Sequence, residues 1–181
     1  MRDQIINFNF RLLHYRYRLV KEWNFPNVVF PHWHCYWTGD RRGGSIHCDG
    51  NTWQLGRENL ILIAPGALIE SRNRRPFMQL YFHFNLNIPF AIVPPGVYTV
   101  KNDPCMMELI HKTCSLAAND NASKPLLPLE LGALIYHAVM QLPLDTFVQK
   151  PTLAPKIKQT ADYLRKNYIQ HVSNADLAEK V

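Results

Sequence analysis

The stretch Phe30-Pro31-His32-Trp33-His34-Cys35-Tyr36-Trp37 alternates polar and aromatic side chains. In an extended strand, His32, His34 and Tyr36 lie on one face and the tryptophans on the other. Further short strand-like runs follow as far as Phe84, cut at close spacing by Gly, Asp, Asn and Pro: 45–48, 52–55, 60–64 and 77–84. This pattern predicts a small, mainly β barrel or sandwich.

A second polar face lies on the run 77–84, where Gln79, Tyr81 and His83 alternate with apolar residues. If both polar faces point into one barrel, they form a pocket for a small polar, sugar-like molecule, because imidazole, phenol and amide groups hydrogen-bond and rings stack on flat faces. The alternative is that these groups satisfy each other or face water. The predicted ligand-binding residues are His32, His34, Tyr36, Trp37, Trp53, Glu70, Gln79, Tyr81 and His83.

The order of these pieces resembles the two-motif signature of the cupin superfamily: a His-x-His strand, a Gly, and an apolar strand that ends at Pro65-Gly66. The resemblance implies a double-stranded β-helix, a small jelly roll, over residues 1–102. Cupin enzymes hold a metal with the His-x-His pair, a Glu and a final His. No Glu follows here at the expected spacing, so we expect no metal and no other cofactor. The alternative metal set implied by the resemblance is His32, His34 and Glu70.

The N-terminal segment changes phase within a strand. Residues 6–12 alternate apolar and polar, and after the doublet Leu12-Leu13 the apolar set becomes Tyr15, Tyr17 and Leu19. A slip of one residue predicts a β-bulge or a strand end. Residues 21–27 are predicted to form a turn. The basic run 72–76 is either a solvated hairpin tip or a contact for an acidic ligand.

A helix is predicted to begin at Asp103, because Asp is a good N-cap and Pro104 suits the first helical position. Met107, Ile110, Cys114 and Ala117 then recur at helical spacing, and Pro128 opens a second helix that runs to Leu142. The second helix is apolar on more than one side, which predicts that the barrel covers one side and a second subunit another. We therefore interpret residues 103–144 as a homodimerisation segment, with contacts from Leu131, Leu134, Ile135, Ala138 and Leu142.

The last part of the chain reads as a linker, residues 145–155, and then helices. Ile157, Ala161, Leu164 and Tyr168 recur at steps of four, three and four, and Ser173 is a candidate N-cap for a further helix. Residues 156–181 resemble the opening of the AraC-type DNA-binding domain, its first helix and the beginning of its second. An aromatic-His-Phe strand such as 81–84 is also frequent in that family.

A cupin-like barrel, paired helices and this opening together resemble an AraC-family transcription regulator. The resemblance implies the effector-sensing and dimerising portion of such a regulator, controlled by a small-molecule effector. Operator DNA is the partner expected of the intact regulator. The recognition helix, which reads the bases, is expected after Val181, so we expect no specific operator binding by this truncated chain.

Composition limits the classes of protein to which the chain can belong. The chain has 181 residues, 47% of them hydrophobic, and a formal net charge of +6, and its apolar runs are too short to cross a bilayer. The polar residues near the N-terminus do not fit a signal peptide, and the four cysteines form no C-x-x-C pair. We expect a bacterial cytoplasmic protein without a membrane partner. The alternative function is a metal-dependent cupin enzyme, an isomerase or dioxygenase, but no nucleophile and base are evident, so we expect no enzyme.

Overall fold

The chain divides into two units, Met1–Phe147 and Val148–Val181. The computed structural model describes residues 9–87, 93–118, 126–143 and 146, all of them in the first unit. The predicted DNA-binding segment at 156–181 lies outside the described residues, as does the predicted linker at 145–155 except for Thr146.

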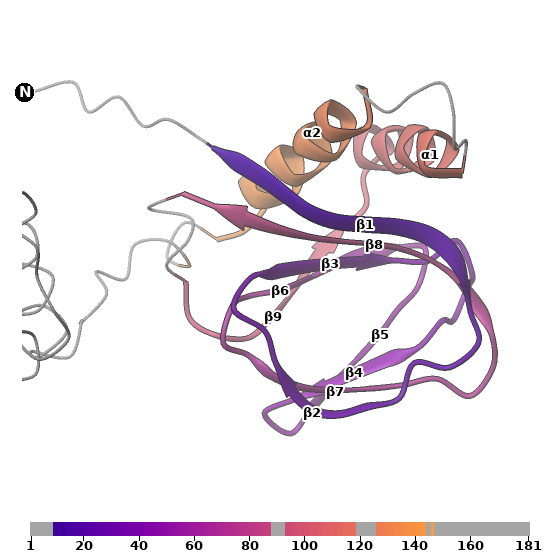
Figure 1. The fold of residues 1–181 in the computed structure, drawn as a ribbon, viewed down its shortest axis with the longest axis vertical. Coiled ribbons are helices and arrows are strands. Elements are labelled where there is room, and N and C mark those ends of the chain that lie inside the picture. Colours follow the sequence, from indigo (N-terminus) through magenta and orange to yellow (C-terminus); the bar gives the residue numbers. More distant parts are fainter. Residues whose placement is uncertain (1–8, 88–92, 119–125, 144–145, 147–181) are drawn as a thin grey trace, which may run out of the picture. The chain divides into compact units, whose positions relative to one another are not determined.

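Two antiparallel sheets and two helices make up the described part of the chain, so the prediction of a mainly β fold followed by helices is confirmed (Figure 1). The larger sheet has the order β1 (Phe10–Val20), β8 (Phe77–Leu86), β3 (Trp33–Trp37), β6 (Asn59–Ile63) and β9 (Val97–Lys101). The smaller sheet has the order β2 (Phe25–Val29), β7 (Leu68–Arg72), β4 (Ser45–Cys48) and β5 (Asn51–Gln54). The helices are α1 (Pro104–Ala118) and α2 (Leu127–Met140). The finer jelly-roll topology remains a prediction.

The larger sheet lies between two apolar cores. One core fills the space between this sheet and the helices, and the other lies between the two sheets (Figure 1). All five residues of β3 are buried, because Trp33, Cys35 and Trp37 belong to the helix-side core while Tyr36 belongs to the core between the sheets. A strand covered on both sides in this way is a stiff support for side chains that project from it.

The predicted phase slip in the N-terminal strand is confirmed as a register irregularity between Leu12 and His14, where β1 pairs with β8. The extra residue lets Phe10 and Leu12 before it, and Tyr15 and Tyr17 after it, all pack on the helix side. Leu19 does not continue that apolar set, since it is 52% exposed.

Two of the breaks expected between strands have different outcomes. The Asp49-Gly50 turn between β4 and β5 has positive φ at both residues, 47° and 75°, as a tight hairpin requires. The turn predicted at 21–27 is wrong in its second half, because Phe25 already pairs with Ser71 and begins β2. Asn27, with φ of 46°, lies within a register irregularity of that strand and absorbs the bend.

The predicted N-cap of α1 is confirmed. The Met106 N–H donates to Asp103 Oδ1 at 2.7 Å, and the His137 Nε2 of α2 lies 2.9 Å from Asp103 Oδ2. The apolar face is shifted by one residue from the prediction at its start, since Met106 is buried and Met107 only half-buried. Asp103 thus caps one helix and contacts the other.

The predicted dimer contacts require a correction. The five residues predicted to meet a partner are buried within this chain, in the helix-side core: Leu131, Leu134, Ile135, Ala138 and Leu142. The sheet and α1 already cover that face. The exposed apolar residues at and near α2 lie on its other side: Leu126, Leu129, Tyr136 and Met140.

No helix in the described ranges is long and apolar enough to cross a bilayer. Cys35, Cys48, Cys105 and Cys114 are free thiols. Cys35, Cys48 and Cys114 are buried, whereas Cys105 is exposed on α1 and so does not fill a core position.

Candidate functional site

A cavity of about 280 Å³ lies between the two sheets. β1, β2, β3, β7 and β8 and the segment between β1 and β2 supply its walls. Five of the nine residues predicted from sequence to bind a ligand line it: His34, Tyr36, Gln79, Tyr81 and His83. The sequence pattern did not decide which face of β3 and β8 points inward. The inward face is the polar one that carries these five residues.

The alternation within β3 and β8 puts these side chains in the cavity. On β3, His34 and Tyr36 point between the sheets while their neighbours pack under the helices. On β8, Gln79, Tyr81 and His83 point the same way, and the residues between them join the helix-side core. The two strands are hydrogen-bonded neighbours, with Tyr36 opposite Tyr81 and His34 opposite His83, so their polar faces merge into one wall.

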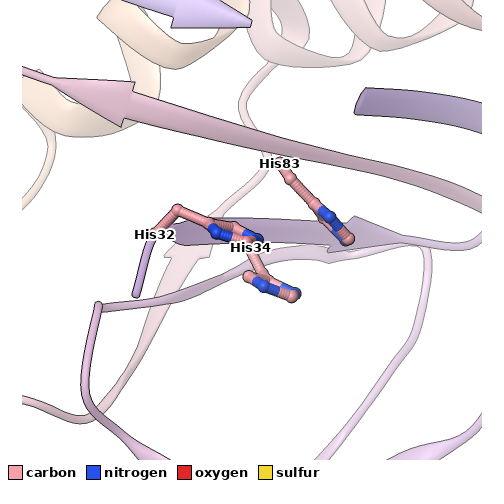
Figure 2. Close-up of side chains that lie close together, drawn as sticks. All are labelled: His32, His34 and His83. Carbon is pink, nitrogen blue, oxygen red and sulfur yellow. The ribbon is translucent and has the colours of Figure 1, made fainter. Parts of the chain in front are cut away.

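Three histidines gather at one end of this wall (Figure 2). His32 and His34 stack with ring centroids 4.8 Å apart and an interplanar angle of 6°. His83 reaches toward them from β8, with its ring centroid 3.9 Å from that of His34 and 5.2 Å from that of His32. One ring nitrogen of each residue lies within 4.8 Å of the others.

Burial keeps these imidazoles neutral. Desolvation, assisted by the neighbouring His83 and His32, lowers the pKa of His34 to about 2. Desolvation, followed by the charges that His32 and His14 would carry, lowers the pKa of His83 to about 4, and desolvation also lowers the pKa of His32. The cluster therefore presents nitrogen lone pairs near pH 7.

Tyr36 holds the central ring in place. Its hydroxyl lies 2.7 Å from His34 Nδ1, and both side chains are buried. Burial also raises the pKa of Tyr36, so the phenol stays protonated. The His34 ring is thereby oriented, with its Nε2 directed away from Tyr36.

Several buried polar atoms of this region have no hydrogen-bond partner within the part of the chain that the structure describes. They are the Nε2 atoms of His32, His34 and Gln79. A buried polar atom without a partner costs about 1–3 kcal/mol, so native proteins rarely leave one unless something else binds it. His34 and Gln79 line the cavity and His32 adjoins it in the histidine cluster, so these atoms make this wall the candidate binding site.

Other cavity residues were missed from the sequence. Trp23 stands edge-on to Tyr36 with ring centroids 5.1 Å apart, and the Arg18 guanidinium lies 5.6 Å from the centre of the Tyr81 ring. Phe25, Phe30 and Ser71 also line the cavity. Trp23 and Phe25 fall in a segment interpreted as a turn, and the only signal for them was the aromatic content of 23–30.

The remaining predicted site residues lie elsewhere. Trp37 faces the helices, where its Nε1 donates to the Arg57 carbonyl at 3.2 Å. Trp53 packs on the core between the sheets from β5 but does not line the cavity. Glu70 points to the opposite side of β7 from the cavity residues Ile69 and Ser71 and pairs with Arg72 at 2.9 Å.

The alternative metal set is corrected accordingly. Glu70 does not join His32 and His34, and the third member of the cluster is His83. The cupin resemblance placed the last ligand after the Pro-Gly turn, at Glu70. The structure instead pairs β8 with β3, which sets His83 opposite His34. His32 joins this cluster without lining the cavity.

A larger hollow of about 810 Å³ lies around the predicted basic loop, and its lining includes Arg42, Arg72, Arg74 and Arg75. Arg72 is paired with Glu70, and Arg75 donates to the Arg42 carbonyl at 3.2 Å. His34 and Gln79, whose buried Nε2 atoms have no partner among the described residues, line the smaller cavity instead, so we place the candidate site there.

Comparison with known proteins identifies no relative by sequence. No family model matches the chain. No curated protein matches it.

Three solved structures of ToxT from Vibrio cholerae resemble this chain. An apo ToxT variant aligns with a TM-score of 0.49 at 7% identity, covering 95% of this chain and 68% of that chain. A ToxT structure in a P21 crystal form aligns with a TM-score of 0.45 at 6% identity, covering 96% of this chain and 69% of that chain. ToxT with a bound unsaturated fatty acid aligns with a TM-score of 0.44 at 7% identity, covering 99% of this chain and 70% of that chain.

Proposed function

We propose that the two sheets and the helices form the ligand-sensing part of a transcription regulator of the AraC type. The observation that carries this proposal is that β3 and β8 each line the cavity with one face and pack in the helix-side core with the other. On β3, His34 lines the cavity while the next residue, Cys35, packs in the helix-side core, and on β8 Tyr81 and Phe82 are related in the same way. A ligand that moves either strand therefore changes the packing of α1 and α2.

This arrangement couples ligand binding to the helices without any moving lid. A ligand shifts an equilibrium only by its differential affinity for the two states, typically about 1–3 kcal/mol. Interiors are close-packed, so a small displacement of β3 is passed to the side chains behind it. We propose a binding role rather than a catalytic role for the cavity.

The proposed ligand is a small polar molecule with a flat or apolar face. The volume of about 280 Å³ fits a molecule near the lower end of the range for small-molecule sites. Gln79 offers an amide donor, and Trp23, Tyr36 and Tyr81 offer ring faces for stacking. A sugar-like compound has both properties.

Thermal denaturation tests this function. The protein is treated with a chelator and screened against monosaccharides and other small polar compounds of similar size. A ligand at a hundredfold excess over its dissociation constant is expected to stabilise the wild type by about 2.7 kcal/mol. Tyr81→Ala and Gln79→Leu should abolish this stabilisation, while Trp53→Phe, outside the cavity, should keep it. Equal stabilisation of all variants, or none of the wild type, would overturn the proposal.

We also propose a homodimer through the outer side of α2. Leu126, Leu129, Tyr136 and Met140 are between 49% and 73% exposed and recur at steps of three, seven and four along the helix. This spacing keeps them on one stripe, the pattern by which two helices pair. Two copies joined in this way would present two DNA-binding halves of the intact regulator to paired operator half-sites.

A further inference from the structure

We propose that His32, His34 and His83 bind one divalent transition-metal ion of the zinc class at the wall of the cavity. This inference deepens the proposed sensing function and rests on it. The ion would add one contact to the small-molecule effector, which the other cavity residues also bind without it. The third ligand comes from β8 and not from the position after the Pro-Gly turn where a ligand was expected.

Backbone pairing brings the three side chains together. His34 and His83 are direct cross-strand partners, and His32 precedes His34 by two residues on the same face (Figure 2). β3 is buried along its whole length and gives His34 a rigid support, while His83 projects from the neighbouring strand β8 and His32 directly precedes β3. Ligands on regular elements are placed more precisely than ligands on loops.

The hydrogen bonds of His34 match those of a metal ligand. Its Nδ1 lies 2.7 Å from the Tyr36 hydroxyl, and in the tautomer with the hydrogen on Nδ1 that N–H donates to the oxygen and leaves the Nε2 lone pair for the ion. Histidines that bind metals usually donate their other ring N–H to a neighbouring group in this way. The Nε2 atoms of His32 and His34 are buried without partners among the described residues, and an ion between them supplies what they lack.

The geometry is close to that of a metal site. One nitrogen of each ring lies within 4.8 Å of the others. Tetrahedral sites with metal–nitrogen bonds of about 2.0–2.1 Å place their nitrogens about 3.4 Å apart. His32 and His83 stack on His34, and imidazole lone pairs lie in the ring plane, so binding requires these two half-buried rings to turn until one nitrogen of each points at the ion.

The ligand type selects the metal. Imidazole suits zinc, copper, iron and nickel, whereas magnesium and calcium prefer oxygen ligands, and the cluster contains no carboxylate. Three protein ligands leave one position of a tetrahedral ion open. Since His34 and His83 line the cavity, that position faces it, and an oxygen or nitrogen of a small molecule can occupy it.

Metal titration of the full chain tests the site. The protein is stripped with a chelator, dialysed, and titrated with Zn²⁺ by calorimetry and with Co²⁺ by visible absorption. We expect one ion per chain and Co²⁺ bands typical of four- or five-coordination. His83→Ala and His32→Ala should each weaken binding by more than about tenfold, since even outer-shell partners contribute about 10–100-fold. These half-buried positions tolerate substitution better than His34.

The matched control is His47→Ala, a histidine of β4 that hydrogen-bonds Ser45 and Thr52 away from the cluster. It should bind like the wild type. Absence of stoichiometric binding, or equal binding by the His32→Ala/His83→Ala double variant, would overturn the metal site. The small-molecule screen in chelator is independent of this result, so failure of the metal proposal and failure of the sensing proposal are distinguishable.

Discussion

His34 on β3 and His83 on β8 face each other across the strand pair with ring centroids 3.9 Å apart. Among the described residues, the structure shows no ion pair between either ring and a carboxylate, and desolvation disfavours the charged form of both. Two neutral imidazoles in close contact at a cavity wall keep their capacity to bind hydrogen-bond donors or a metal ion. We therefore interpret the polar wall as a binding surface, because the buried Nε2 atoms of His34 and Gln79 have no partner among the described residues.

Removal of the Tyr36 hydroxyl should release His34. Tyr36→Phe leaves a buried His34 Nδ1 without its partner, and we expect the free energy of unfolding to fall by about 1–3 kcal/mol. Metal affinity should also fall, by about 10–100-fold, because the ring loses its orienting contact. Urea denaturation and Zn²⁺ titration measure the two effects. Tyr17→Phe, on the helix side, is the control, and an equal loss there would contradict the role given to Tyr36.

Acid should destabilise the metal-free protein through the histidine cluster. In the unfolded chain each histidine binds a proton below pH 6.5, whereas in the folded protein the pKa of His83 is about 4 and that of His34 about 2. The unfolded state therefore binds more protons between these values, and stability should fall as pH falls from 6.5 toward 4.

Urea midpoints in chelator, measured at about pH 8 and about pH 5, test this sign. His83→Gln removes one of the titrating groups, so its midpoint should drop less between the two conditions than that of the wild type. The same drop in both proteins would show that other groups cause the acid effect.

The outer side of α2 should control the oligomeric state. Leu129 and Met140 are 69% and 73% exposed, so Leu129→Lys/Met140→Lys should convert a homodimer to a monomer that keeps the circular dichroism spectrum of the wild type. Leu134 is fully buried, and Leu134→Lys should instead unfold the chain, because it places a charge in the core. Analytical ultracentrifugation with circular dichroism separates the two results. A wild type that is monomeric at micromolar concentration would exclude this dimer.

Asp103 should stabilise the helical pair as a whole. Its carboxylate accepts from the Met106 N–H and contacts His137 and Gln141 of the α2 end, and the Met106 contact is the main reason that its pKa is lowered. Asp103→Ala should lower the thermal midpoint, while Asp103→Asn retains a capping oxygen and should lower it less. Equal midpoints for the two variants would mean that capping contributes little here.

Local periodicity predicted the parts of the structure that depend on neighbouring residues. The alternation in 32–37 and 77–84, the bulge after Leu12 and the cap at Asp103 were all readable from the chain, because each follows from backbone geometry over a few residues. Five of the predicted site residues share one cavity for the same reason: two neighbouring strands carry the same alternation.

Tertiary packing decided which side chains face the cavity and which are buried in the helix-side core. β3 is buried on both sides, so its composition could not show which side holds the cavity. The choice of His83 over Glu70 depends on the pairing of β8 with β3, which joins segments about fifty residues apart. The burial of Leu131 and Leu134 within the chain depends on the sheet and α1 together. In each case the sequence supplies the chemistry of a side chain, and only long-range pairing determines its surroundings.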